Sequence, residues 1–268
     1  ALKGENFDGH EYARASVKAG AILAVTERSV DGTTPCIIVK DVRKALLEIA
    51  HFVRKKYKPV LVGITGSVGK TTTKNMTALA LSASKSVLKT EGNRNNAIGM
   101  PFTLFRLNST CNAAVIEMGM SHKGEIETLS KTASPTICMI TNIGDSHIEN
   151  FESREGILNA KLEIIKGAAN GAPIILNGDD EYLSRIIADH SDVYNIISYG
   201  VENKKCNYYA DDIEIHGDRM KFNVYCYGEF LTEVSLFCWG RHNISNALAA
   251  ITAAATARVD PVLAADML

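Results

Sequence analysis

The stretch 59–74, PVLVGITGSVGKTTTK, decides the fold of this chain. An apolar run leads into a glycine-rich turn that ends in Lys70 and two threonines. Glycines let backbone N–H groups close around phosphate oxygens, and the start of a helix adds partial positive charge. The lysine can reach the outer phosphates, and a hydroxyl after it can hold Mg²⁺. The stretch therefore predicts a strand, a phosphate-binding loop and a helix, with ATP or GTP as the ligand.

This loop departs from the common phosphate-loop pattern. The position five residues before the Gly-Lys pair is Ile64 instead of glycine, and glycines stand at 63, 66 and 69. The alternative is an ordinary strand-to-helix turn of an α/β protein, but the strand before and the helix after favour the phosphate loop. The predicted nucleotide-binding residues are Gly66, Ser67, Val68, Gly69, Lys70, Thr71 and Thr72.

The composition describes an ordinary soluble globular protein, with 46% hydrophobic and 22% charged residues in a chain of 268. Basic and acidic residues number 29 and 30, so charge gives no reason to expect nucleic acid or an anionic membrane as partner. Six cysteines form no C-x-x-C pair, which favours buried free thiols in a reducing cytoplasm. No apolar segment is long enough to span a bilayer, no leader opens the chain, and both ends look cut. We expect a cytoplasmic protein, present here as a fragment.

Strands and helices alternate along the part of the chain that follows residue 58. Continuous apolar strands separated by helices predict a mostly parallel sheet with helices on both faces. Ligands of such folds bind beyond the carboxyl ends of the strands. The expected strands are 60–65, 113–119, 136–144 and 173–180, and the expected helices lie near 70–83, 123–132 and 154–168.

Two further regions flank this alternation. Residues 1–57 contain short apolar strands and a helical pattern, and Lys58 with Pro59 marks a domain boundary. After Tyr199, alternating stretches separated by turns that contain glycine predict an antiparallel meander. The fold class is therefore α/β, with a central P-loop domain at 58–268 and a partial small α/β domain at 1–57. The early strands are 21–25 and 36–40, the early helix is 42–57, the meander strands are 211–217, 220–228 and 232–240, and a last helix covers 240–255.

Polar side chains follow the predicted strands at their carboxyl ends. Glu117 can reach Mg²⁺ on a phosphate held by Lys70, or it can be solvated at a sheet edge, and spacing leaves the two alternatives even. His147 follows the next strand and can bind a metal or a phosphate, although a lone loop histidine is more often unremarkable. Asn142 and Asp145 lie beside it, and Asp145 is equally suited to capping the turn.

Lys161 borders the apolar face of a predicted helix. On pattern alone a surface lysine with a buried stem is the better explanation, although a partly desolvated lysine can lose its proton and become reactive.

Two groups of amide side chains complete the candidate set. The loop with Asn93, Arg94, Asn95 and Asn96 can supply turn and cap residues, or it can contact an anionic substrate. Near the last helix start, histidine and asparagine side chains can bond an adenine ring or cap the helix. These residues are His242, Asn243 and Asn246.

Five blocks of this sequence together resemble the Mur ligases of peptidoglycan synthesis, in family order. Within the family, NRNNAIGMPFTL favours the type that adds D-Ala-D-Ala. The opening 25 residues look like the later part of the family's N-terminal UDP-substrate-binding domain, so 1–57 would be part of that domain and 58–268 the central ATP-binding domain. The blocks are GITGSVGKTTTK, EGNRNNAIGMPFTL, IEMGMSHKGEI, TNIGDSHIENFESREGILNAKLEI and GRHNISNALAA.

The resemblance implies an ATP-dependent amide ligase that joins D-Ala-D-Ala to UDP-N-acetylmuramoyl-tripeptide through an acyl phosphate. It implies ATP and two Mg²⁺ ions as cofactors and a monomeric protein. The family's C-terminal domain is absent, so we expect this chain to ligate poorly or not at all by itself.

The same resemblance assigns roles to single residues. Lys70 would hold the β- and γ-phosphates, and Thr71 or Thr72 with Glu117 would bind Mg²⁺. Lys161 would be carbamylated by CO₂ and would hold a second Mg²⁺, which replaces its explanation as a surface lysine. In this assignment the catalytic residues are Lys70, His147 and Lys161, the metal ligands include His147, Asn243 contacts ATP, and Asn93, Asn95, Asn96 and Asn142 bind substrate.

Other functions stay open at this point. Another ligase of the same fold, such as MurE, MurC or folylpolyglutamate synthetase, would differ in acceptor and amine. A P-loop kinase or GTPase would transfer or hydrolyse phosphate, although no guanine-specifying N-K-x-D sequence is recognisable. A catalytically silent nucleotide- or UDP-peptide-binding module is the third alternative.

Overall fold

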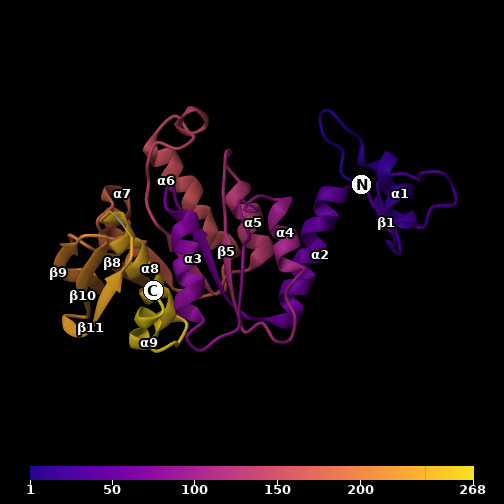
Figure 1. The fold of residues 1–268 in the computed structure, drawn as a ribbon. Coiled ribbons are helices and arrows are strands. Elements are labelled where there is room, and N and C mark those ends of the chain that lie inside the picture. Colours follow the sequence, from indigo (N-terminus) through magenta and orange to yellow (C-terminus); the bar gives the residue numbers. More distant parts are fainter. Residues whose placement is uncertain (239) are drawn as a thin grey trace.

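The computed structural model describes residues 1–238 and 240–268, so Trp239, at the end of the third predicted meander strand, lies outside the described residues. The described chain forms a nine-stranded sheet and a separate two-stranded sheet near the N-terminus (Figure 1). The strand order of the large sheet is β11-β10-β9-β8-β7-β6-β3-β5-β4. The strand of the phosphate loop, β3 (Val60–Thr65), thus lies between β5 and β6.

The strands from β4 to β8 run parallel, as the alternation of strands and helices predicts. All their carboxyl ends therefore meet at one edge of the sheet, where ligands of such folds bind. The bounds are β4 (Val87–Lys89), β5 (Ala113–Glu117), β6 (Ile137–Ile140), β7 (Ile174–Asn177) and β8 (Ile196–Gly200).

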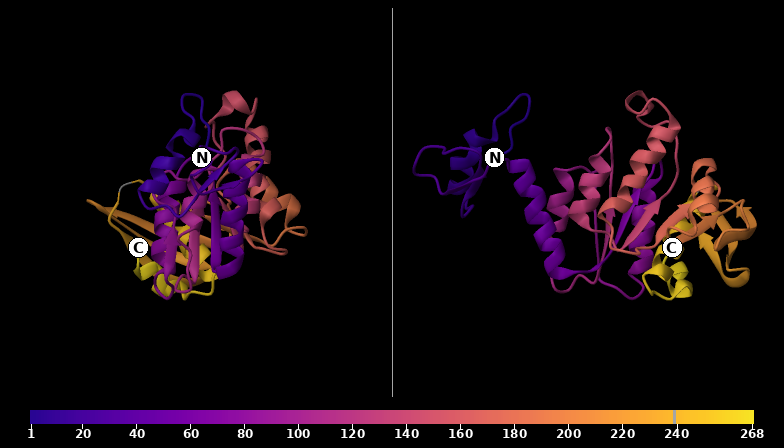
Figure 2. Two further views of the ribbon diagram at one scale, coloured as in Figure 1. Left: turned by 90° about the vertical axis from the view of Figure 1, so that its right-hand side faces the viewer. Right: turned by 180° about the vertical axis from the view of Figure 1, so that it is seen from behind.

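Helices cover both faces of this sheet (Figure 2). On one face, α3 (Lys70–Leu81) and α8 (His242–Thr256) pack on a core that includes Val62 and Ile64. On the other face, helices α2 and α4 to α7 pack on a core that includes Leu61. Neighbouring residues of one strand are thus buried in opposite layers, which explains the continuous apolar strand sequences. The second face is covered by α2 (Val42–Tyr57), α4 (Gly99–Leu104), α5 (Glu125–Ala133), α6 (Arg154–Leu162) and α7 (Glu181–His190).

The predicted antiparallel meander is confirmed, and it continues the large sheet. β9 (Tyr208–His216) pairs in parallel with β8, and β10 (Arg219–Cys226) and β11 (Glu229–Leu236) follow in antiparallel pairing. The short helix α9 (Pro261–Asp266) comes after α8.

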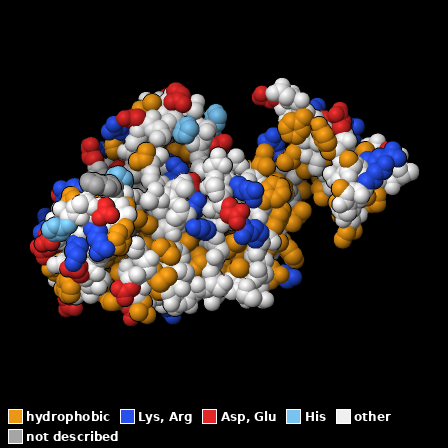
Figure 3. All heavy atoms as spheres, viewed as in Figure 1, with side chains coloured by type: hydrophobic (Ala, Val, Ile, Leu, Met, Phe, Trp, Pro, Cys, Tyr) orange, Lys and Arg blue, Asp and Glu red, His pale blue; other side chains and the backbone are white. Residues whose placement is uncertain are grey.

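The N-terminal unit lies beside the main body and is joined to it through α2 (Figure 2). It contains a short 3₁₀ helix, one helix, and two strands that pair in parallel. Hydrophobic side chains are exposed on this unit and along α2 (Figure 3), among them Ile22, Ile38 and Phe52. Its elements are η1 (Gly9–Tyr12), α1 (Ala13–Lys18), β1 (Ala24–Thr26) and β2 (Cys36–Ile38).

All six cysteines are free, as expected, but only Cys138 and Cys206 are buried, so the expectation of buried thiols is wrong for the other four. These four cysteines lie near strand ends or at other partly buried positions, where an apolar sequence does not guarantee full burial. In the parts of the chain that the structure describes, no helix has both the length and the apolarity to span a bilayer.

Candidate functional site

The glycine-rich loop between β3 and α3 is held by close backbone packing. A Cβ atom on Gly66 would lie 1.9 Å from the Thr141 hydroxyl oxygen, so no larger residue fits without a shift. Gly69 adopts a left-handed conformation with φ of 77° and precedes α3. No side chain caps the start of α3, so its first N–H groups are available to an anion.

Lys70 lies over this loop. Its ammonium donates to the carbonyl oxygens of Gly66 at 2.8 Å and Ser67 at 3.1 Å. Burial lowers the pKa of Lys70, and the nearby Glu117 carboxylate opposes part of that shift. The cation is thus positioned at the loop that is predicted to hold phosphate.

The side chain of Asn142 braces the loop from the end of β6. Its oxygen accepts the N–H groups of Ser67 at 3.1 Å and Val68 at 2.9 Å, and its amide nitrogen donates to the Val68 carbonyl at 3.0 Å. The Ser67 hydroxyl also accepts from the N–H of Gly144 at 2.8 Å. The segment that leads to His147 is therefore attached to the phosphate loop, while substrate binding by Asn142 stays a prediction.

Glu117 lies at the end of β5 beneath the first turn of α3, and it is only 2% exposed. Its carboxylate accepts from the Thr71 hydroxyl at 3.0 Å and from the Asn95 amide at 2.9 Å. Lys74, also buried, forms an ion pair with it at 3.4 Å. Lys74 is not among the predicted site residues, although its i+4 spacing from Lys70 places the two on one face of α3.

A cavity of about 290 Å³ brings Lys70, Asn95, Asn96 and His147 together. His147 is exposed and adopts a left-handed backbone conformation with φ of 63°. The Asn96 side chain also accepts two N–H groups at the start of α4. Thr72 and Asn93 are exposed and do not line this cavity.

Lys161 is buried in α6 with 3% of its surface exposed, so the explanation as a surface lysine is wrong. Its position among apolar neighbours outweighs the length of its side chain, which would otherwise reach water. Burial, with the charge of Lys70, lowers the pKa of Lys161 to about 7. Within the described residues its ammonium has no hydrogen bond or ion pair, and they hold no group of three His, Cys, Asp or Glu side chains suited to a metal.

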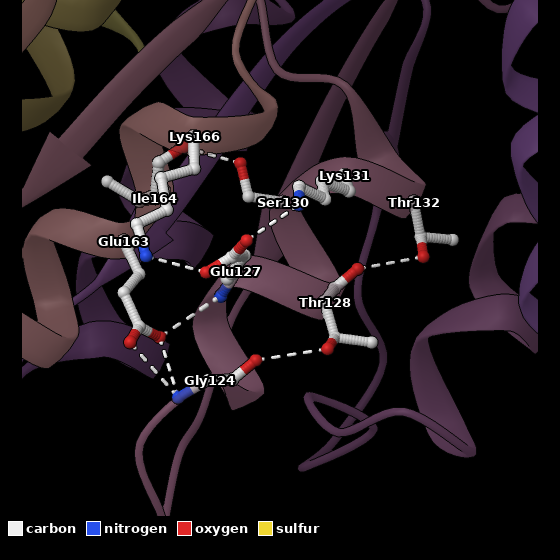
Figure 4. Close-up of polar contacts among 9 residues, drawn as sticks. All are labelled: Gly124, Glu127, Thr128, Ser130, Lys131, Thr132, Glu163, Ile164 and Lys166. Atoms are coloured by element: carbon white, nitrogen blue, oxygen red, sulfur yellow. Dashed lines mark hydrogen bonds and ion pairs between the residues drawn. The ribbon is translucent and has the colours of Figure 1, made fainter.

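The short 3₁₀ helix η3 (Glu163–Gly167), which follows α6, is fastened to α5 (Figure 4). The buried Glu163 carboxylate accepts the N–H groups of Gly124 at 2.9 and 3.0 Å and of Glu127 at 3.3 Å. Glu127 in turn pairs with Lys166 at 2.6 Å. Two residues after Lys161, the chain is thus anchored to the start of α5.

A second cavity, of about 410 Å³, opens on the other side of the phosphate loop. Val68 and Gly69 line it together with His242 and Asn246 from α8. Asn246 accepts from the Thr73 hydroxyl at 2.9 Å, and its amide donates to the Asn243 side chain at 3.2 Å. The phosphate loop thus lies between two cavities, an arrangement that suits an extended ligand with a phosphate group at its middle.

Comparison with known proteins agrees with this geometry. Residues 64–254 match the Mur ligase middle domain. The chain is 37% identical over 264 residues to a UDP-N-acetylmuramoyl-tripeptide--D-alanyl-D-alanine ligase of Bacillus subtilis (strain 168), which covers 97% of this chain and 56% of that protein.

The structure is also similar to solved structures of Mur ligases. A crystal structure of MurF from Acinetobacter baumannii superposes with a TM-score of 0.92 at 32% identity, covering 100% of this chain and 58% of that one. MurF ligase from Thermotoga maritima in complex with ADP gives a TM-score of 0.85 at 28% identity over 94% of this chain and 58% of that one. The chain spans about half the length of the curated relatives it matches.

Proposed function

This chain belongs to the Mur ligase family, and we propose from this that it carries the ATP-binding part of a ligase that joins D-Ala-D-Ala to UDP-N-acetylmuramoyl-tripeptide. The observation that carries the proposal is the phosphate loop with Lys70 above it and Glu117 beneath the start of α3. We further propose that the protein is a cytoplasmic monomer, which light scattering after size-exclusion chromatography tests for the oligomeric state.

In this proposal ATP extends across the loop. Its base occupies the cavity of about 410 Å³ beside His242 and Asn246, and its phosphates follow the loop toward Lys70. The free N–H groups at the start of α3 and the Lys70 ammonium supply positive charge to the phosphates. The ADP complex of the Thermotoga maritima relative supports a nucleotide on this fold.

The residues at the loop fit a magnesium ion. Mg²⁺ prefers oxygen ligands, and the Thr71 hydroxyl and the Glu117 carboxylate lie 3.0 Å apart beside the loop. These two groups would hold the ion together with phosphate oxygens, and it would neutralise charge on the transferred phosphoryl group. Thr72 and His147 stay predicted ligands.

We also propose that Lys161 is carbamylated. A buried amine with a pKa of about 7 is substantially neutral near neutral pH, and the neutral amine is the form that adds to CO₂. The new anion would also compensate the neighbouring Lys70 charge, which the bare lysine cannot do. A second Mg²⁺ would then have a carbamate ligand.

In the proposed reaction, this chain's own groups would act mainly in the phosphoryl transfer. The acceptor carboxylate, in the cavity with Asn95, Asn96 and His147, would attack the γ-phosphate, so that the bond to the bridging oxygen breaks, ADP leaves and an acyl phosphate forms. Lys70 stabilises the charge that develops on the phosphoryl oxygens. The amine of D-Ala-D-Ala then attacks the acyl carbon and releases phosphate.

Calorimetry with a non-hydrolysable ATP analogue and Mg²⁺ tests the nucleotide site. We expect binding by the wild type and a loss of at least about tenfold in Lys70→Ala, since a charged hydrogen bond contributes about 1.5–3 kcal/mol. Lys205→Ala, which removes an exposed lysine that lines neither of the two cavities, is the matched control. A folded wild type that does not bind the analogue contradicts the proposal.

Ligation is tested by phosphate release with ATP and a panel of UDP-sugar peptides and amines. Release that requires both UDP-N-acetylmuramoyl-tripeptide and D-Ala-D-Ala supports this ligase and excludes a silent binding module. Preference for another acceptor or amine assigns the chain to a different ligase of the fold. The same assay tests the expectation that this chain ligates poorly by itself.

A further inference from the structure

Two buried residues, Thr65 and Lys161, carry polar groups for which the structure shows no partner among the described residues. Thr65, the last residue of β3, is 0% exposed, and its hydroxyl oxygen has no hydrogen-bond partner. Lys161 is 3% exposed as a residue, and among the described residues its ammonium makes no hydrogen bond or ion pair, although its nitrogen is not one of the fully buried unpaired atoms. Buried polar groups are nearly always hydrogen-bonded, so the unpaired Thr65 hydroxyl in the region of Lys161 indicates a missing polar group.

The pairing of β3 shows which way Thr65 points. It is in register with Ile140 of β6, and paired residues of parallel strands point to the same face. Ile140 belongs to the core layer that α5 and α6 cover, whereas Ile64 belongs to the opposite layer. The Thr65 side chain therefore faces the layer that contains α6.

Contacts of Ile164, in η3, show at which level of the sheet the helical segment after Lys161 packs. Its carbonyl oxygen accepts from the Cys138 thiol at 3.6 Å, and a Cβ atom on Gly63 would lie 3.5 Å from its side chain. Gly63 and Cys138 are themselves paired in register. Ile164 therefore lies at the level of Gly63, two residues before Thr65.

Lys161 rises from that level toward Thr65. The chain segment of α6 connects the carboxyl end of β6 to the start of β7, so it runs opposite to the strands. Three helical residues, partly α and partly 3₁₀, raise Lys161 above Ile164 by about 4.5–6 Å, and two strand residues raise Thr65 by about 6.6 Å. Ile157, Lys161 and Ile164 follow i, i+4, i+7 spacing and share one buried face. Thr65 and Lys161 thus lie at nearly the same level of one layer.

We propose that the Thr65 hydroxyl donates a hydrogen bond to a carbamate on Lys161 and acts as the positioning residue of that group. This inference rests on the carbamylation in the proposed function. The Lys161 nitrogen bonds to the carbon of CO₂ and loses one proton to solvent, which gives a carbamate with a single negative charge. One carbamate oxygen accepts from Thr65, and the other stays free to face the cavity that contains Lys70.

The chain offers a matched control for this hydroxyl. Thr77 is also 0% exposed and also has an unpartnered hydroxyl, but it lies in α3, on the opposite face of the sheet. Thr65→Val and Thr77→Val each remove one buried orphan hydroxyl and keep the branched shape. A difference in CO₂ affinity between the two variants therefore reflects the position of the Thr65 hydroxyl near Lys161, and not the loss of a buried hydroxyl as such.

The experiment is ¹³C NMR of the protein equilibrated with ¹³C-bicarbonate over a range of CO₂ concentrations. Lys161→Met identifies the carbamate resonance, because that variant cannot form it. We expect about a tenfold weaker CO₂ affinity in Thr65→Val, as loss of one hydrogen bond to an anion predicts, and the wild-type value in Thr77→Val. Thr65→Ser, which keeps the hydroxyl, should keep most of the affinity.

Three results would overturn the inference. Equal CO₂ affinity in wild type and Thr65→Val would show that the Thr65 hydroxyl makes no hydrogen bond to the carbamate. If Thr65→Val does not fold, equal affinity in Thr65→Ser and Thr65→Ala does the same. A wild type with no carbamate resonance overturns both this inference and the carbamylation, while Lys70-dependent nucleotide binding would still support the rest of the proposed function.

Discussion

The carboxylate of Glu117 has three polar partners in the described part of the structure. It is buried, it accepts from Thr71 and Asn95, and it pairs with the equally buried Lys74 at 3.4 Å. A buried carboxylate needs such partners, because its transfer from water is otherwise very costly. Lys74 therefore stabilises the charged Glu117 carboxylate beside the phosphate loop. The proposed magnesium ion would compete with Lys74 for this carboxylate.

Substitution of Lys74 tests how much the buried Glu117 carboxylate depends on its ion pair with Lys74. We expect Lys74→Met to destabilise the fold by about 3 kcal/mol, because it leaves a buried charge without its partner. Urea unfolding measures the change. The double variant Lys74→Met/Glu117→Gln removes both charges and should recover part of the loss. Strictly additive effects in this cycle would show that the two side chains do not interact.

Lys161 gives a prediction about pH. Its pKa is about 7 in the folded chain and near the ordinary 10.5 when unfolded, so the unfolded chain binds more protons between these values. Stability contributed by this group therefore rises with pH across that window, by at most about 1.4 kcal/mol per pH unit. Lys161→Met lacks this contribution. Urea unfolding of both proteins in CO₂-free buffer from pH 7 to 10 should give a growing difference, and parallel curves would contradict it.

Local patterns predict residues of the candidate site but not the contacts that surround them. Lys70 and Glu117 could be predicted because a phosphate loop and a carboxylate after an apolar strand are patterns of adjacent residues. The burial of Lys161 could not, because it depends on how deeply α6 packs on the sheet. Asn142 was predicted as a substrate ligand, and its bonds to Ser67 and Val68 depend on two segments that lie far apart in the sequence.

At the scale of elements, the junction between α5 and η3 shows how one side chain can fix two segments. α5 has no cap from its own preceding residue, and Glu163 supplies the acceptor from η3 instead. A carboxylate at this position also interacts favourably with the positive end of the helix. The chain after Lys161 is therefore held at a fixed distance from α5.

Removing this carboxylate should loosen the junction. We expect Glu163→Ala to cost about 1–2 kcal/mol, the usual effect of a lost helix cap, and to increase hydrogen exchange at Gly124 and Glu127. Glu155→Ala, on the exposed side of α6, serves as the control and should change neither. Unchanged protection at both amides in Glu163→Ala would mean that the cap does not stabilise α5.

Most elements of the main body were predictable, with small errors at their ends. The helix predicted over 154–168 is α-helical only to Leu162 and then tightens into η3, where Gly167 lies against Ser130 of α5. Helix α7 and strand β8 were not predicted, although Asp180 caps α7 in the usual way. The order of the strands in the sheet could not be predicted from the sequence either, because pairing joins segments that are distant in the chain and leaves no local pattern.

At the scale of the whole molecule, α2 links the N-terminal unit to the sheet. Its residue Arg54 is 5% exposed and donates to the carbonyl oxygens of Ala133 at 2.8 Å and Ser134 at 3.1 Å, at the end of α5. A cation at a helix C-terminus is favourable. The predicted domain boundary at Lys58 stays a prediction, but α2 itself packs on the main body.

A substitution in α2 can test whether the packing of α2 on the main body affects nucleotide binding. Arg54→Met keeps a long apolar side chain but leaves two helix-end carbonyls without their donor, so we expect a loss of about 2 kcal/mol and faster hydrogen exchange along α2. Lys55→Met, one residue later and exposed, is the matched control and should behave as wild type. Nucleotide binding should persist in both variants, because Arg54 fastens α2 to the end of α5 whereas the phosphate loop is braced by Asn142. If Arg54→Met also lost nucleotide binding at unchanged overall folding, the position of α2 would control the site, and the N-terminal unit and the sheet would have to act as one body.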